Sequence, residues 1–183
     1  RAALTEFRER ESDWVQDYAV YRALHDGHNG KPWYQWDLPV RRRDRRALTV
    51  THNRLSDEIN HHAFIQFLFE RQWRALRGYA AERKVALLGD VPIFVAHDSA
   101  DVWAHQEQFL LNAQGMPTVV AGVPPDAYSA DGQRWGNPLY RWDRMAEEGF
   151  AWWIDRIRED LRCADLLRLD HFRGFASYWE IPA

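Results

Sequence analysis

The segment from Leu166 to Phe175 constrains the fold most, because a short apolar run leads directly into charged residues and a loop. Leucine-rich runs of this kind are typical of parallel strands that are covered on both faces. Polar side chains at the carboxyl end of such a strand lie where active sites form in (β/α)8 barrels. Because Arg168 and Asp170 are two positions apart, their side chains leave the predicted strand on the same face.

A cation beside Asp170 favours the ionised form of its carboxyl group and lowers the carboxyl pKa. A carboxylate that resists protonation is suited to nucleophilic attack, so the spacing of Arg168 and Asp170 indicates a catalytic pair. The alternative is an ordinary structural ion pair at a strand end, because such pairs also perturb pKa values.

The first part of the chain, residues 1–83, is predicted to be mostly helical from its apolar spacing. A long helix is expected from Ser56 to Arg83. Apolar residues occupy most of its faces, which predicts that the helix is buried between partners.

The second part alternates strands and helices. Val85–Val95 predicts a strand whose regular part pauses near Asp90, because Pro92 cannot donate to a ladder. Arg144–Arg162 predicts one helix, with Phe150 and Ile154 among its inward-facing residues, and the strand ending at Asp170 follows. Strand, helix and strand in this order predict a parallel unit.

Between these elements the sequence predicts a hairpin and a loop. Phe109–Asn112 and Pro117–Val120 are joined across Gln114 and Gly115, as in a hairpin. Pro124–Pro138 is rich in proline, glycine and aspartate and is predicted to be a functional loop, because long loops in compact domains are usually functional or disordered.

The composition excludes several classes of partner. A net charge of −3 over 183 residues gives no general attraction to nucleic acid or to membranes, and no apolar run reaches the roughly 20 residues of a spanning helix. The basic run Arg41–Arg46 is interpreted as a solvated loop, and the adjacent His61 and His62 are not interpreted as metal ligands. The only cysteine, Cys163, leaves no internal disulfide and is expected to be buried, which is consistent with a cytoplasmic location.

Three blocks resemble those of the amylomaltases, the 4-α-glucanotransferases or disproportionating enzymes of the α-amylase clan. The blocks are Arg168–Phe175 followed by Ser177–Ala183, Gly89–Trp103, and Gly122–Asp126 with Gly132–Tyr140. The similarity runs in order and spacing from about Arg8 to Ala183. It implies an α/β fold that is part of a (β/α)8 TIM barrel, with a mostly helical inserted subdomain. Residues 1–83 would form the subdomain and 84–183 the partial barrel, with a substrate loop at 122–140.

The resemblance implies transfer of an α-1,4-glucan segment to the 4-hydroxyl of an acceptor glucan or glucose, by a retaining double displacement that uses no cofactor and no metal. Asp170 would be the nucleophile, and Arg168 would keep it ionised and oriented. The partners would be α-1,4-glucans and maltooligosaccharides, not nucleic acid or a membrane.

Four further residues are implied to bind substrate. His171 and Asp126 would hydrogen-bond sugar hydroxyls, Trp135 would stack on a sugar ring, and Asp90 would support the pocket. Other interpretations remain open: His171 could cap the strand end, Trp135 could only pack its loop, and Asp90 could support Arg168 rather than touch substrate. The sequence departs from the family at His97, where an acidic residue is expected, and at Ala127, where an aromatic is usual.

The acid/base glutamate and the transition-state aspartate of the family match no residue here. The sequence is therefore expected to be an internal fragment that needs the rest of the catalytic domain, and inactive alone. Two alternatives remain: an α-glucosidic hydrolase of the same clan, or a non-catalytic glucan-binding fragment.

Overall fold

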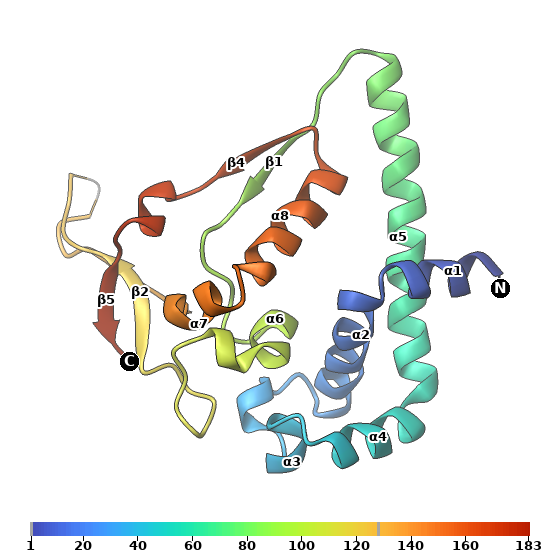
Figure 1. The fold of residues 1–183 in the computed structure, drawn as a ribbon, viewed down its shortest axis with the longest axis horizontal. Coiled ribbons are helices and arrows are strands. Elements are labelled where there is room, and N and C mark those ends of the chain that lie inside the picture. Colours follow the sequence, from blue (N-terminus) through green and yellow to red (C-terminus); the bar gives the residue numbers. More distant parts are fainter. Residues whose placement is uncertain (1, 128) are drawn as a thin grey trace. The chain divides into compact units, whose positions relative to one another are not determined.

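The computed structural model describes residues 2–127 and 129–183 and separates into two compact units. Unit 1 contains Arg1–Gly78 and Asp98–Ala104, and unit 2 contains Tyr79–His97 and His105–Ala183. Helices and strands are mixed (Figure 1), which confirms the α/β class. The elements in chain order are α1 (Ala2–Arg10), α2 (Ser12–Gly27), η1 (Trp33–Gln35), α3 (Leu38–Arg41), α4 (Arg45–Arg54), α5 (Ser56–Glu82), β1 (Leu88–Val91), α6 (Ala100–Ala104), η2 (Gln106–Gln108), β2 (Val119–Val123), β3 (Gln133–Pro138), α7 (Trp142–Glu147), α8 (Ala151–Cys163), β4 (Leu166–Leu169), η3 (Phe172–Phe175) and β5 (Trp179–Pro182).

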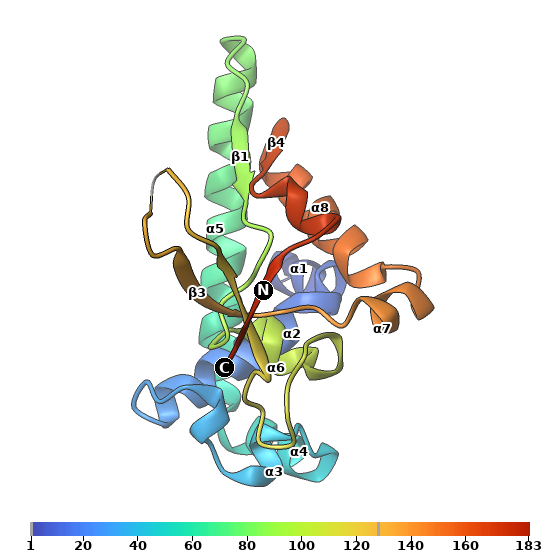
Figure 2. The same ribbon diagram turned by 90° about the vertical axis from the view of Figure 1, so that its left-hand side faces the viewer.

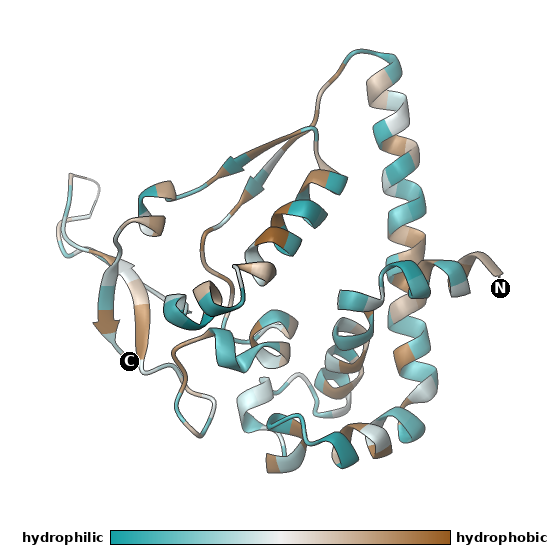
Figure 3. Cartoon of the chain, in the orientation of Figure 1, coloured by the Kyte–Doolittle hydropathy of each residue, from teal (hydrophilic) through white to brown (hydrophobic). Residues whose placement is uncertain are grey.

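Unit 1 is helical, and the predicted long helix is confirmed as α5, Ser56–Glu82. One part of α5 is buried, and its Phe67 packs in an apolar cluster with Phe7 and Val15. Hydrophobic and hydrophilic residues alternate along the helix (Figure 3), and Phe69 is 50% exposed. The prediction that α5 is buried on most faces is therefore wrong for this chain, because its packed residues cover only part of its apolar surface.

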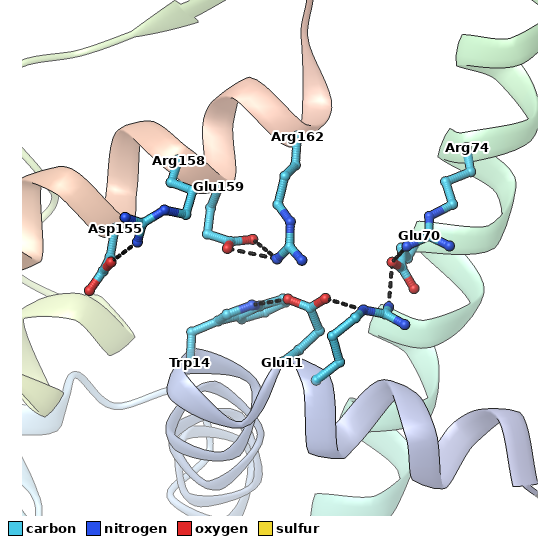
Figure 4. A network of polar contacts seen from close by, with 9 residues as sticks. Glu11, Trp14, Glu70, Arg74, Asp155, Arg158, Glu159 and Arg162 are labelled. Atoms are coloured by element: carbon cyan, nitrogen blue, oxygen red, sulfur yellow. Dashed lines mark hydrogen bonds and ion pairs between the residues drawn. The ribbon is translucent and has the colours of Figure 1, made fainter.

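A buried carboxylate stabilises the junction of α1 and α2. Glu11 is only 4% exposed and accepts hydrogen bonds from Arg10 Nε at 2.7 Å and from Trp14 Nε1 at 3.1 Å. Arg10 also contacts Glu70 of α5, which pairs with Arg74 (Figure 4). Burying Glu11 is tolerated because a cation and an indole N–H satisfy its oxygens.

The two strands β1 and β4 of unit 2 are paired in parallel (Figure 1), as predicted. The regular part of β1 ends at Val91, directly before Pro92. Helix α8 contacts both strands. Leu88 and Leu166 are nevertheless 68% and 59% exposed, so the expectation that the strands are covered on both faces is wrong here.

A second sheet in unit 2 is antiparallel, with the order β3-β2-β5. The predicted hairpin forms around an Asn112–Gly115 turn with a bridge between Leu111 and Pro117, and its second arm continues into β2. The prediction of a functional loop from Pro124 to Pro138 is wrong over Gln133–Pro138, which is strand β3 (Figure 2). Tyr128, within that loop, lies outside the described residues.

The single helix predicted from Arg144 to Arg162 is instead two helices, α7 and α8. Gly149 and Phe150 between them have φ of 64° and 58°, a left-handed conformation that interrupts the helical path. Phe150 and Ile154 are 44% and 49% exposed rather than inward-facing, and Cys163 is exposed rather than buried. Among the described residues, none of the helices combines the length and the apolar character that crossing a membrane requires.

Substitutions at two glycines, Gly122 and Gly78, are expected to have opposite effects on stability. A Cβ at Gly122 would collide with Ile181 and lie 2.5 Å from the Gln133 carbonyl oxygen, whereas a Cβ at Gly78 within α5 meets nothing within 4 Å. We expect Gly122→Ala to lower the free energy of unfolding by about 1–3 kcal/mol, and Gly78→Ala to raise it by about 0.5–1 kcal/mol. Urea denaturation of both variants measures these changes. A free energy of unfolding that is unchanged or raised in Gly122→Ala would show that the sheet relaxes around residue 122.

Candidate functional site

The ends of β1 and β4 bring together a carboxylate and an arginine that are far apart in the sequence. Asp90 and Arg168 are register partners in the parallel pair. Arg168 donates from Nε to Asp90 Oδ1 at 2.9 Å and from Nη2 to Asp90 Oδ2 at 2.7 Å. This two-bond geometry fixes the plane of the guanidinium as well as its charge.

Asp170 lies directly beyond β4, and its carboxylate is on the same side of the two strands as the Arg168 guanidinium. Its backbone N–H donates to the Val91 carbonyl at 3.0 Å, so the pairing of β1 and β4 extends to this residue. Arg168 Nη2 lies 3.4 Å from Asp170 Oδ1. One guanidinium therefore links two carboxylates, Asp90 by two short hydrogen bonds and Asp170 by a longer ion pair.

The electrostatics of this group follow from that geometry. The hydrogen bonds from Arg168 hold the pKa of Asp90 below its usual value. Asp90, and to a smaller extent the charge of Asp170, raise the pKa of Arg168. The spacing in the sequence associated Arg168 with Asp170, whereas in the structure Arg168 is held more closely by Asp90. This contact agrees with the open interpretation that Asp90 supports Arg168.

The residue after Asp170 contacts the predicted sugar-stacking tryptophan. His171 has φ 49° and directly precedes the short helix η3, Phe172–Phe175. Its ring lies edge-on to Trp135 of β3, with centroids 5.1 Å apart. Trp135 also donates from Nε1 to Gln133 Oε1 at 2.9 Å and stays 38% exposed, so part of this residue remains open to solvent.

Asp126 is held by its own loop. Its Oδ1 accepts the Ser129 N–H at 2.8 Å and its N–H donates to the Ser129 carbonyl at 2.9 Å. The structure thus brings together Asp90, Arg168 and Asp170 in one group and Trp135 and His171 in another, adjoining group, while Asp126 lies on a separate exposed turn.

Several residues around these groups were not singled out from the sequence. Phe94 is 5% exposed and lies in ring contact with Trp135, and Asn137 donates to the Val95 carbonyl at 2.8 Å. In the sequence, the apolar residues around Pro92 are the feature that could have indicated a packing role for Phe94. His97, one of the two departures from the family pattern, lies with Nε2 2.8 Å from the Gly115 carbonyl oxygen.

Among residues 2–127 and 129–183, no three His, Cys, Asp or Glu side chains are grouped to hold a metal ion.

Comparison with known proteins matches the whole chain. A family model described as 4-alpha-glucanotransferase matches residues 1–183. The chain is 55% identical over 183 residues to a 4-alpha-glucanotransferase of Thermus thermophilus, covering 100% of the chain and 37% of that protein. It is 45% identical over 172 residues to a chloroplastic/amyloplastic 4-alpha-glucanotransferase of Solanum tuberosum, covering 94% of the chain and 30% of that protein.

A solved structure is similar along nearly the same length. It is described as an amylomaltase from Streptococcus agalactiae in complex with acarbose, and the TM-score is 0.94 at 41% sequence identity. The match covers 98% of this chain and 36% of that one. The chain thus spans about a third of the length of these relatives.

Proposed function

The chain belongs to the 4-alpha-glucanotransferase family, and we propose that the protein moves α-1,4-glucan segments between chains by a retaining double displacement in which Asp170 is the nucleophile. The observation that carries this proposal is the position of Asp170 at the carboxyl end of β4, 3.4 Å from a guanidinium that Asp90 holds in place. Carboxyl ends of barrel strands are where catalytic residues gather in this kind of fold.

In the first step, an Asp170 oxygen attacks the anomeric carbon of the donor, and the bond from that carbon to the glycosidic oxygen breaks. The leaving oxygen takes a proton from a general acid. In the second step, the 4-hydroxyl of an acceptor attacks the same carbon, its proton passes to the former acid, and the Asp170 carboxylate is released. Two inversions retain the α configuration.

Asp90 is poorly suited to be the acid of this reaction. Arg168 occupies both of its oxygens and lowers its pKa, so the carboxyl group stays ionised. We propose that Asp90 orients Arg168, which in turn orients Asp170, and that the acid comes from chain outside residues 1–183. The same chain would complete the (β/α)8 barrel of which β1 and β4 are part, with the helical residues 1–83 as an inserted subdomain beside residues 84–183.

Substrate binding is proposed for two residues next to the nucleophile, Trp135 and His171, and for Asp126 on its separate turn. Trp135 is partly exposed and lies next to His171, and we propose that a sugar ring stacks on the indole while His171 hydrogen-bonds one of its hydroxyls. Asp126, on its exposed turn in the loop 122–140, would bind hydroxyls farther along the donor. A cytoplasmic location stays a prediction.

The products from maltotriose test the function. We define the complete protein as residues 1–183 with any adjoining chain encoded with them. Purified complete protein incubated with maltotriose is expected to form maltotetraose and longer oligosaccharides together with glucose and maltose. Products that are only shorter than maltotriose would identify a hydrolase, and unchanged maltotriose in the presence of glucan binding would identify a binding domain.

Trp135→Ala tests the stacking role. Loss of an aromatic contact of about 1–2 kcal/mol predicts a KM for maltoheptaose raised roughly 5- to 30-fold, with a much smaller change in kcat. Initial rates at varied maltoheptaose concentration give both constants. Trp179→Ala is the control, because it removes an indole of β5 that is 54% exposed. Trp142→Ala would be unsuitable, because that ring packs against other aromatic rings. A KM unchanged in Trp135→Ala would show that the indole only packs against His171 and Phe94.

A further inference from the structure

The irregular segment Pro92–Phe94, directly after β1, is held by side chains from elsewhere in unit 2. Arg156 of α8 donates from Nη2 to the Pro92 carbonyl at 2.6 Å. Tyr140 donates its hydroxyl to the Ile93 carbonyl at 2.7 Å. Arg156 Nη1 also lies 3.3 Å from the Tyr140 hydroxyl oxygen, so the arginine, the phenol and the two carbonyls form one connected group.

Both side chains that hold this segment are themselves restrained. Tyr140 is 1% exposed and its ring packs among the aromatic residues of unit 2. The Arg156 guanidinium lies over Trp152 and Trp153, 5.5 and 5.0 Å from their ring centroids. A cation over two indole faces is attracted to both, which keeps the guanidinium in place.

The held segment supports both groups of the candidate site. Ile93 is 3% exposed and packs so closely under η3 that a Cβ at Gly174 would lie 2.6 Å from Ile93 Cδ1 and 3.0 Å from His171 Cδ2. The next residue, Phe94, packs against Trp135. The backbone that Arg156 and Tyr140 hold therefore carries one side chain beneath the turn after Asp170 and another beneath the indole.

We propose that Arg156 and Tyr140 are positioning residues, which act on Asp170, His171 and Trp135 through the backbone of Pro92–Phe94. This inference rests on the proposed glucanotransferase function. Catalytic groups must be held within roughly 0.5 Å of their productive positions. Without the Tyr140 hydroxyl, the Ile93 carbonyl keeps only the longer contact from Arg156 Nη1 at 3.5 Å. Without the Arg156 guanidinium, the Pro92 carbonyl loses its link to α8, so either change loosens the segment beneath the site.

Two substitutions test the proposal in the complete protein. Tyr140→Phe removes a single hydroxyl and keeps the buried ring, and Arg156→Gln removes the bridging guanidinium. We expect each to lower kcat with maltotriose on the order of tenfold, because misplacement by about 1 Å can cost 10²-fold. Arg156→Lys should recover part of the loss, since an ammonium can reach one carbonyl but cannot bridge to the phenol as a planar fork does.

Arg158→Gln is the matched control. Arg158 lies on the same helix, its side chain is 61% exposed, and it pairs with Asp155 of α8 (Figure 4). Its substitution is expected to leave kcat within twofold of the wild type. Thermal denaturation of every variant gives the folded fraction, so that kcat is expressed per folded molecule.

The outcomes distinguish a failure of the positioning role from a failure of the proposed glucanotransferase function. Reduced kcat per folded molecule in Tyr140→Phe and Arg156→Gln, with Arg158→Gln unaffected, supports the positioning role; if Arg156→Gln does not fold, Tyr140→Phe decides alone. A kcat within twofold of wild type, even with a lower melting temperature or a raised KM, would overturn it, because the contacts would then serve stability or binding only. Wild-type protein that makes no product longer than maltotriose would refute the proposed function instead.

Discussion

Asp170→Asn is expected to lower the rate of glucan transfer by a factor on the order of 10³ or more. Asparagine keeps the shape of the side chain but has no anionic oxygen to attack the anomeric carbon, so the first displacement fails. An activated donor such as a glycosyl fluoride should not restore the rate, because it replaces the leaving group and not the nucleophile. Product formation from maltotriose, followed over time, measures the loss.

Asp155→Asn provides the control for this substitution. Asp155 is an exposed aspartate of α8 that pairs with Arg158 on the same helix (Figure 4). The same Asp-to-Asn change there should leave the rate unchanged. If Asp170→Asn retained a rate within tenfold of wild type, Asp170 would not be the nucleophile.

Arg168→Lys is expected to be nearly as damaging as Arg168→Ala. The arginine makes two bonds to Asp90 and a third contact to Asp170, and a lysine ammonium keeps the charge but loses the planar fork that spans both carboxylates. We expect both variants to lose on the order of 10²-fold or more in kcat, since orientation errors of this size have such effects. Steady-state rates of both variants measure this.

The comparison of Arg168→Lys with Arg168→Ala shows whether the arginine acts through its charge alone or through its planar geometry. If Arg168→Lys recovered most of the activity lost in Arg168→Ala, the arginine would act as a point charge and the link through Asp90 would be unnecessary. Arg158→Lys on the exposed surface of α8 should have no effect and shows that the substitution itself is tolerated.

The elements that the sequence predicted well are those with a local cause. The long helix was placed to within one residue, because its apolar spacing persists without a proline. Strand β1 ended before Pro92, because proline lacks the N–H of a ladder. Parallel pairing of β1 and β4 followed from the order strand, helix, strand. Each of these depends on a few neighbouring residues.

The elements predicted wrongly depend on distant parts of the chain. The helical pattern continues through Phe150, and only the left-handed conformation at Gly149 and Phe150 separates α7 from α8. Strand β3 has too few β-branched residues to be recognised, and it forms because β2 pairs with it. Exposure of Phe69 and Cys163 depends on what packs against their helices, which the sequence of those helices does not contain.

The candidate site divides in the same way. Period-two spacing placed Arg168 and Asp170 on one face, and the structure agrees, with the two side chains 3.4 Å apart. The tighter partner of Arg168 is Asp90, 78 residues earlier, and only the register of the parallel strands aligns these two positions. Arg156 and Tyr140 escaped notice because they reach the site through backbone carbonyls, which have no signature in the sequence.

Trapping the glycosyl-enzyme intermediate tests the central claim, that Asp170 forms a covalent bond to the donor sugar. The complete protein would be incubated with a fluorinated glycosyl fluoride that forms the intermediate rapidly and releases it slowly, digested, and analysed by mass spectrometry. We expect the added sugar mass on the peptide that contains Asp170, and no such mass in Asp170→Asn. Active protein that carries the sugar on a different carboxylate, or that turns over with no covalent sugar on any residue, would contradict the assignment.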